Sequence, residues 1–224
     1  SILGKKAHNT FFYKDNSQTQ LLEGNRVSNL LKEKPLSIQF KKVDDRGQAL
    51  SGAVFELRDP NGGVVAKTTS TNDGTVRFNN VKIANGYTIR EVSVPRGYDV
   101  SQQILTLTDD IIQAGYAKNP AVVSLDNFVN NANGSVEFVK VNSDGQPIPG
   151  VTFELSKGNL KYEAVSGTDG KVVFDNILPG TGYTLKETRP PYNMMPIDPI
   201  TNIEVKVRGV TKLGETYKNV ANAI

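Results

Sequence analysis

The chain carries one sequence pattern twice, and this repeat constrains its fold more than any other feature. The first copy opens with Phe40-Lys41-Lys42-Val43 and the second with Phe138-Val139-Lys140-Val141. The motifs that follow each opening keep the same order, so each copy is expected to be one structural unit. The matched positions are Gly47-Gln48 with Gly145-Gln146, Phe55-Glu56-Leu57 with Phe153-Glu154-Leu155, Asp73-Gly74 with Asp169-Gly170, Phe78 with Phe174, Asn80 with Asn176, and residues 86–91 with 182–187.

Each unit has the pattern of a β-protein. Short stretches of Val, Ile, Phe, Tyr and Thr alternate with polar residues, and Gly, Asp-Gly and Asn-Gly separate them. No long segment has helical periodicity. Short, regularly spaced strands with such turns predict an all-β fold of tandem immunoglobulin-like β-sandwich domains arranged end to end. The two Asp-Gly pairs are interpreted as tight turns, since the alternating acidic residues of a calcium loop are missing.

Chain length supports two domains. The 224 residues suffice for two domains of about 100 residues each. We predict the first sandwich at residues 35–131 and the second at residues 134–224, joined by a short linker that limits flexing. Residues 1–34 are too short for a unit. Asn29 precedes the first unit at about the spacing with which Asn127 precedes the second, so we interpret this segment as the terminal strands of a truncated preceding domain.

Composition excludes several classes of function. The chain has no cysteine and one histidine, His8, which rules out disulfides, thiolate zinc sites and cysteine nucleophiles. We therefore expect no metal, no cofactor and no activity on external substrates. A net charge of +3, spread along the chain, argues against nucleic-acid binding. No apolar run approaches the roughly 20 residues of a membrane span, so this fragment is not expected to insert into a membrane.

Strand alternation places three polar side chains on the apolar face of each unit, because side chains two residues apart share a face. In each unit one lysine, one glutamate and one asparagine follow an apolar residue at this spacing. They are Lys42, Glu91 and Asn127 in the first unit, and Lys140, Glu187 and Asn219 in the second.

Burial of such a trio predicts unusual chemistry. It lowers the pKa of a lysine and raises that of a glutamate, so both groups are driven towards neutrality. A neutral amine is a nucleophile, and a protonated carboxyl can polarise an asparagine amide and move protons. These parts suffice for an intramolecular transamidation. Two alternatives remain on this reasoning: a buried Lys–Glu ion pair with a hydrogen-bonded Asn, or side chains at strand ends that extend into water.

The repeated motifs also carry a family resemblance. The pattern F-x-K-V, G-x-x-x-G-x-x-F-E-L, D-G-x-x-x-F-x-N and Y-x-I/L-x-E resembles the B-type domains of collagen-binding adhesins and the prealbumin-like domains of Gram-positive pilins. The stretch from Tyr183 to Tyr192 is similar to the pilin E-box, and Tyr87 to Glu91 is a looser copy. The resemblance covers about residues 35–224.

The resemblance implies specific roles for the trios. In that family a lysine of the first strand bonds to an asparagine of the last strand, with the E-box glutamate as catalyst. Carried over, this pairs Lys42 with Asn127 through Glu91, and Lys140 with Asn219 through Glu187. Asn130 and Asn222 lie close to the two asparagines and remain alternative acceptors. Lys41 is disfavoured because it points to the opposite face.

Together these features predict an extracellular structural protein. We expect a stalk or shaft segment of a cell-wall-anchored adhesin or pilus, stabilised by autocatalytic Lys–Asn isopeptide bonds, with neighbouring domains or pilin subunits as partners. The alternative is an adhesin module that binds a host extracellular matrix protein. No tryptophan is present and no aromatic cluster marks a binding face in residues 35–224, which favours the structural role. A hydrolase on a related scaffold is disfavoured by the single histidine.

Overall fold

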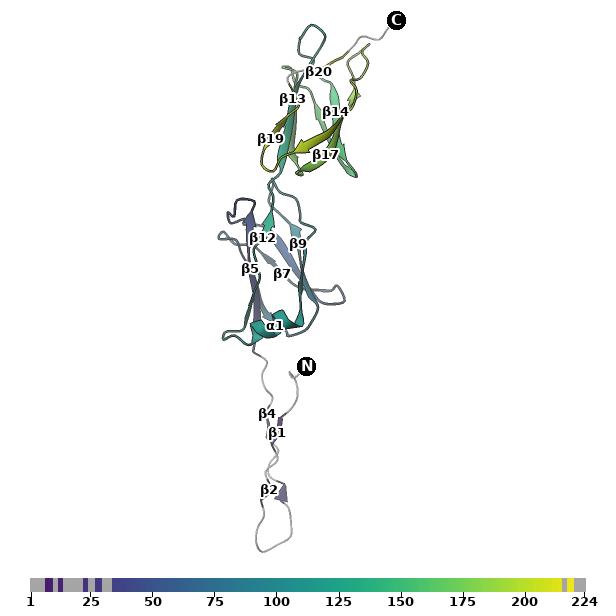
Figure 1. Ribbon diagram of the computed structural model, residues 1–224. Helices are drawn as coiled ribbons and strands as arrows, with labels where there is room; N and C mark the ends of the chain where they lie inside the picture. Colours follow the sequence, from purple (N-terminus) through teal and green to yellow (C-terminus); the bar gives the residue numbers. More distant parts are fainter. Residues whose placement is uncertain are drawn as a thin grey trace.

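The computed structural model describes residues 34–214 and 219 in full, and the backbone alone of residues 7–9, 12–13, 22–23, 27–29 and 217–218. Residues 34–219 form two β-sandwiches that lie end to end (Figure 1). This arrangement confirms the predicted all-β fold with two repeated sandwich units.

The first sandwich is built from two four-stranded sheets. In one, the strand order is β10-β9-β6-β7; in the other, β5 pairs with β8 on one side and with β11 and β12 on the other. Both β11 and β12 run parallel to β5. The elements are β5 (Leu36–Asp44), β6 (Val54–Arg58), β7 (Val64–Thr69), β8 (Thr75–Val81), β9 (Tyr87–Ser93), β10 (Ile104–Leu107), α1 (Asp109–Tyr116), β11 (Val122–Ser124) and β12 (Phe128–Asn130).

The second sandwich repeats this plan. One sheet has the order β15-β14-β17-β18; in the other, β13 pairs antiparallel with β16 and parallel with β19 and β20. Its elements are β13 (Gly134–Val141), β14 (Thr152–Lys157), β15 (Leu160–Val165), β16 (Lys171–Ile177), β17 (Gly180–Arg189), β18 (Ile200–Val205), β19 (Val210–Lys212) and β20 (Tyr217–Lys218).

Each sandwich has its own apolar core between its sheets. In the first, the ring of Phe55 lies 5.0 Å from that of Phe40 and 5.0 Å from that of Phe128, both edge to face. In the second, Phe138 and Phe153 make the equivalent contact at 4.9 Å. Such edge-to-face aromatic pairs stabilise a core by more than the apolar area that they bury would account for. Because the cores are separate, each unit contains the contacts of an independent domain.

The connection before the last strand differs between the units. In the first it contains the short helix α1, whose Ile112 is fully buried. This helix is too short to show clear helical periodicity in the sequence and was not expected. In the second the connection is the tight turn 206–209. Figure 1 shows α1 at the end of the first sandwich that faces away from the second sandwich. The junction between the two sandwiches is therefore formed by loops and strand ends.

The N-terminal segment is described only in part. The backbone of β1 (Ala7–Asn9) pairs antiparallel with β4 (Val27–Asn29), and that of β2 (Phe12–Tyr13) with β3 (Leu22–Glu23). The side chains of His8 and Asn29 lie outside the described residues. The assignment of residues 1–34 to a truncated preceding domain therefore stays a prediction.

Candidate functional site

A fully buried lysine lies on the first strand of each sandwich. Lys42 on β5 and Lys140 on β13 both have 0% of their surface exposed. Each follows an inward-facing phenylalanine two residues earlier, as strand alternation predicts. The Lys42 amine lies 5.7 Å from the centre of the Phe128 ring, and the Lys140 amine 6.0 Å from that of Phe153. Both amines are thus held among aromatic side chains rather than in water.

The repeated Asp-Gly turns fix the backbone of these lysines. The amide of Lys42 donates to the Gly74 carbonyl, and that of Lys140 to the Gly170 carbonyl, each at 2.7 Å. Both glycines have left-handed backbones, with φ of +78° and +74°. A Cβ added at Gly74 would lie 2.5 Å from the Lys42 carbonyl oxygen, and one at Gly170 2.4 Å from that of Lys140. The glycines therefore allow the turn to pack directly on the lysine strand.

Glu91 and Asn130 complete the trio of the first unit. Glu91 on β9 and Asn130 on β12 are each 4% exposed. The Asn130 Nδ2 donates to Glu91 Oε2 at 2.7 Å and to the carbonyl of Asp99 at 3.0 Å. The Ser101 amide also donates to Glu91 Oε2, at 2.8 Å. Glutamate and asparagine are thereby held in direct contact inside the sandwich.

The second unit reproduces this geometry with Glu187 and Asn219. Glu187 on β17 is 7% exposed and Asn219 is 4% exposed. The Asn219 Nδ2 donates to Glu187 Oε2 at 2.9 Å and to the Met195 carbonyl at 2.5 Å. The Lys140 amine lies 3.7 Å from Glu187 Oε1. The three residues predicted for this unit therefore meet at one buried point.

The predicted placement of Asn127 is wrong. Asn127 is exposed, and Asn130 takes the position beside Glu91. The cause is a break in the last strand: Ser124 pairs with Gln39, and Phe128 with Lys42. Four residues on the last strand thus oppose three on β5, and this extra residue reverses which side chains face inward.

A second repeat in the sequence marks the correct asparagine. Phe128-Val129-Asn130 and Tyr217-Lys218-Asn219 share the pattern aromatic-x-Asn. The structure pairs the aromatic position with the lysine in both units, Phe128 with Lys42 and Tyr217 with Lys140. Alignment of the two units on this pattern, rather than on strand alternation from Leu125, would have selected Asn130.

Burial shifts the ionisation of these groups. The pKa of Lys42 falls to about 8 because burial disfavours its charged form, although the charges of Glu91 and Asp44 partly oppose the fall. Burial likewise lowers the pKa of Lys140, against the charge of Glu187. The pKa of Glu91 is raised by burial, despite hydrogen bonds from Asn130 and Ser101. In the first unit both partners are thus shifted towards neutrality.

Each trio contains two buried oxygens that receive no hydrogen bond. They are Glu91 Oε1 and Asn130 Oδ1 in the first unit, and Glu187 Oε1 and Asn219 Oδ1 in the second. An unsatisfied buried oxygen is costly, and its appearance at the same two atoms in both units points to one shared cause. In the first unit, where burial raises the pKa of Glu91, a proton on this glutamate would supply a hydrogen-bond donor to the neighbouring oxygen.

The other candidates lie elsewhere. Lys41 is exposed and forms an ion pair with Asp73 at 2.8 Å. Asn222 lies outside the described residues. Within the described part of the chain, no group of three or more His, Asp or Glu side chains is arranged to share a metal ion. No helix there combines the length and apolarity that a membrane crossing requires.

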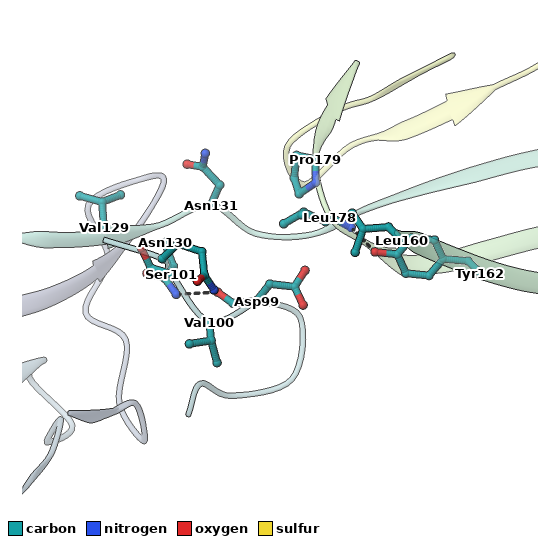
Figure 2. A pocket seen from close by; sticks show the side chains of 11 residues that line it. Asp99, Val100, Ser101, Val129, Asn130, Asn131, Leu160, Tyr162, Leu178 and Pro179 are labelled. Atoms are coloured by element: carbon teal, nitrogen blue, oxygen red, sulfur yellow. Dashed lines mark hydrogen bonds between the residues drawn. The ribbon is translucent and has the colours of Figure 1, made fainter. Parts of the chain in front are cut away.

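Asn130 also borders a cleft between the two sandwiches. Figure 2 shows its side chain beside Asp99 and Ser101, with Leu160 and Pro179 of the second unit across the cleft. The amide of the first trio is therefore close to the junction of the two units, whereas the lysine lies deeper in the sandwich.

Comparison with known proteins agrees with this architecture. A streptococcal ancillary pilin superimposes with a TM-score of 0.53 at 17% identity, over 97% of this chain and 76% of that one. GBS52, the minor pilin of Streptococcus agalactiae, superimposes with a TM-score of 0.50 at 13% identity, over 84% of this chain and 97% of that one. Colossin-A of Dictyostelium discoideum is 27% identical over 170 residues, which is 67% of this chain but 2% of that protein. At these identities the likeness shows the fold.

A family model establishes membership more directly. The model of the SpaA prealbumin-like fold domain matches residues 36–118 and, separately, residues 134–219. One match falls within each sandwich, the first ending before β11, and together they cover most of the chain. They confirm the resemblance to prealbumin-like pilin domains that the repeated motifs indicated. The chain therefore belongs to the family of SpaA prealbumin-like fold domains.

Proposed function

We propose that the chain is a stalk or shaft segment of an extracellular adhesin or pilus, and that each sandwich forms its own Lys–Asn isopeptide bond. The bonds would join Lys42 to Asn130 and Lys140 to Asn219. One observation carries the proposal: the same buried Lys–Glu–Asn trio occurs twice, on equivalent strands. The similarity of fold to two streptococcal pilins supports the proposed role in a pilus or surface adhesin.

The reaction requires no external reagent. The neutral amine of Lys42 attacks the amide carbon of Asn130, a C–N bond forms, the bond from that carbon to Nδ2 breaks, and ammonia leaves. Glu91 accepts the proton lost by the amine and delivers one to the departing nitrogen. The Asn130 Nδ2 already contacts Glu91 Oε2 at 2.7 Å, which suits this transfer. The chemistry acts on the chain itself, so no turnover of another substrate is proposed.

The position of the bond suits a load-bearing role. The chain enters the first sandwich along β5 and leaves it along β12, and these strands pair side by side. A bond between Lys42 and Asn130 would carry tension from entry to exit without loading the hydrogen bonds of the other strands. It would also restrict the unfolded chain, as a disulfide does. The same reasoning holds for β13 and the segment that ends at Asn219.

Accurate intact mass of the denatured protein tests the proposal. We expect a deficit of two ammonia molecules in the wild type and of one in Lys42→Ala, Glu91→Ala or Asn130→Ala. Asn127→Ala and Lys41→Ala are matched controls that should keep both losses, because these side chains are exposed. A wild-type mass equal to that of the sequence would refute the cross-links and leave two buried ion pairs.

A further inference from the structure

One side chain of the second unit, Arg208, contacts acidic residues of the first unit at the end of β5. Arg208 lies in the turn between β18 and β19. Its Nη2 donates to Asp44 Oδ2 at 2.8 Å and to Asp45 Oδ1 at 3.0 Å, and its Nε to Asp45 Oδ2 at 3.3 Å. Its backbone amide donates to the Ala132 carbonyl in the linker at 3.1 Å. The guanidinium is thereby fixed on the end of the first sandwich.

Asp44 is part of the surroundings of Lys42. It lies two residues after Lys42 on the same buried face of β5, and its Cα is paired with that of Asn130. The acidic groups that act on the Lys42 amine are Glu91 and Asp44. A carboxylate at this position stabilises the charged ammonium form of Lys42, and that form cannot attack the amide.

The second unit shows that the charge of Asp44 is not needed for the local turn. Asp44 Oδ1 accepts the amides of Arg46 and Gln48, each at 2.9 Å. The equivalent residue of the second unit is neutral: Asn142 Oδ1 accepts the amides of Asp144 and Gln146 at 3.0 and 2.9 Å. Asparagine thus builds the same turn. The feature peculiar to the first unit is the negative charge together with its arginine partner.

We propose that Arg208 of the second unit is a positioning residue for the cross-link of the first, because it engages the Asp44 carboxylate at the junction and so favours the reactive state of Lys42. The proposal rests on the isopeptide function proposed above. It makes bond formation between Lys42 and Asn130 depend on a docked second unit. The bond of the second unit, beside the neutral Asn142, needs no such partner.

The ionisation of the junction supports this role. Burial alone would raise the pKa of Asp44, but the amides of Gln48 and Arg46 and the charge of Arg208 together hold it below its usual range. The hydrogen bond from Arg208 also lowers the pKa of Asp45. Without the guanidinium, both carboxylates would still be ionised at neutral pH, and the charge of Asp44 would act on Lys42 without a counter-ion.

Refolding of unreacted protein provides the test. The 224-residue chain, recovered unfolded and with a mass that shows no ammonia loss, is diluted into folding buffers between pH 6 and 9. Samples are quenched in denaturant at intervals and digested, so that peptides report the two bonds separately. The variants are Arg208→Gln, Asp44→Asn and the double variant. The bond between Lys140 and Asn219 serves as the internal control for folding of the second unit.

Arg208→Gln should slow the Lys42–Asn130 bond about threefold near pH 7, the effect of about half a pKa unit on the neutral amine. Its rate profile should move to higher pH, while the second bond is unchanged. Asp44→Asn alone should form the Lys42–Asn130 bond at least as fast as the wild type. Combined with Arg208→Gln, it should bring the slowed rate back to at least that of the wild type. Unchanged kinetics in Arg208→Gln, or an equally slow double variant, would overturn the inference. A wild type that folds without any ammonia loss would refute the proposed function and the inference with it.

Discussion

At the scale of residues, the two trios are places where the fold accepts a local cost. A buried lysine and glutamate lose hydration that a single ion pair does not fully replace. The shifted pKa of Lys42 and the oxygens without hydrogen bonds express that cost. Formation of an amide between lysine and asparagine would remove the one ionisable group of this pair, the lysine amine. The same burial that destabilises the charged lysine therefore makes its neutral amine available as a nucleophile.

A variant that cannot form the bond should reveal this cost through pH. In Asn130→Ala, Lys42 stays an amine, and burial should keep its folded pKa, about 8 with Asn130 in place, below the ordinary value of 10.5. Between these values the unfolded chain binds the extra proton, so stability rises with pH over this window. Urea unfolding from pH 7.5 to 10.5 measures it. Addition of Lys42→Met should abolish the rise; a rise that persists would place its origin elsewhere.

At the scale of elements, the irregular features align the trio. The extra residue between β11 and β12 turns Phe128 and Asn130 inward, and the Asp-Gly turn holds the opposite edge of β5. A regular last strand would have continued the alternation set by Val123 and directed Asn127 inward. The bulge therefore decides which asparagine meets the glutamate.

Substitution of the turn glycine tests the importance of this packing. Gly74→Ala, in an Asn130→Ala background without the bond, should cost roughly 1–3 kcal/mol of unfolding free energy because a left-handed backbone is combined with a clash against the Lys42 carbonyl. Gly47→Ala is the matched control: its φ is +76° but no atom lies within 4 Å of the added Cβ. Equal losses in urea titrations of both variants would show that the close approach is unimportant.

At the scale of the whole molecule, the junction is held from both sides. Ala132 in the linker donates its amide to Asp45 and accepts from the amide of Arg208, and Asn133 donates to the Gly97 carbonyl. With the ion pairs of Arg208, these contacts tie the linker to both sandwiches. Figure 1 shows the resulting end-to-end arrangement. The limited flexing expected from the short linker stays a prediction.

Tension applied to the two ends should distinguish linked from unlinked units. In single-molecule pulling, the wild type should show no unfolding event from either sandwich, because the proposed bonds bypass the other strands. Lys42→Ala should show one event, and Lys42→Ala combined with Lys140→Ala should show two. Unfolding of both units in the wild type would contradict covalent load bearing.

The junction should loosen when its ion pairs are removed. Arg208→Ala is expected to broaden the distribution of molecular dimensions in small-angle scattering at pH 7, whereas Lys212→Ala, which removes an exposed pair with Glu137, should not. Acid should have the same effect. Because the pKa values of Asp44 and Asp45 are lowered from 3.8, the ion pairs should persist at that pH and be lost only below it. Equal scattering from Arg208→Ala and the wild type would argue that the backbone contacts alone fix the junction.

The sequence by itself determined the repeat, the β-sandwich class and five of the six residues that meet in the trios, because strand alternation and turn residues act over a few positions. Strand alternation failed for the sixth, because a one-residue bulge that only the tertiary structure shows reverses which side chains face inward. The repeated aromatic-x-Asn pattern was the mark of Asn130 in the sequence. The contact of Arg208 with Asp44 likewise could not be predicted from the sequence. It joins residues 164 positions apart, and it depends on how two folded units dock.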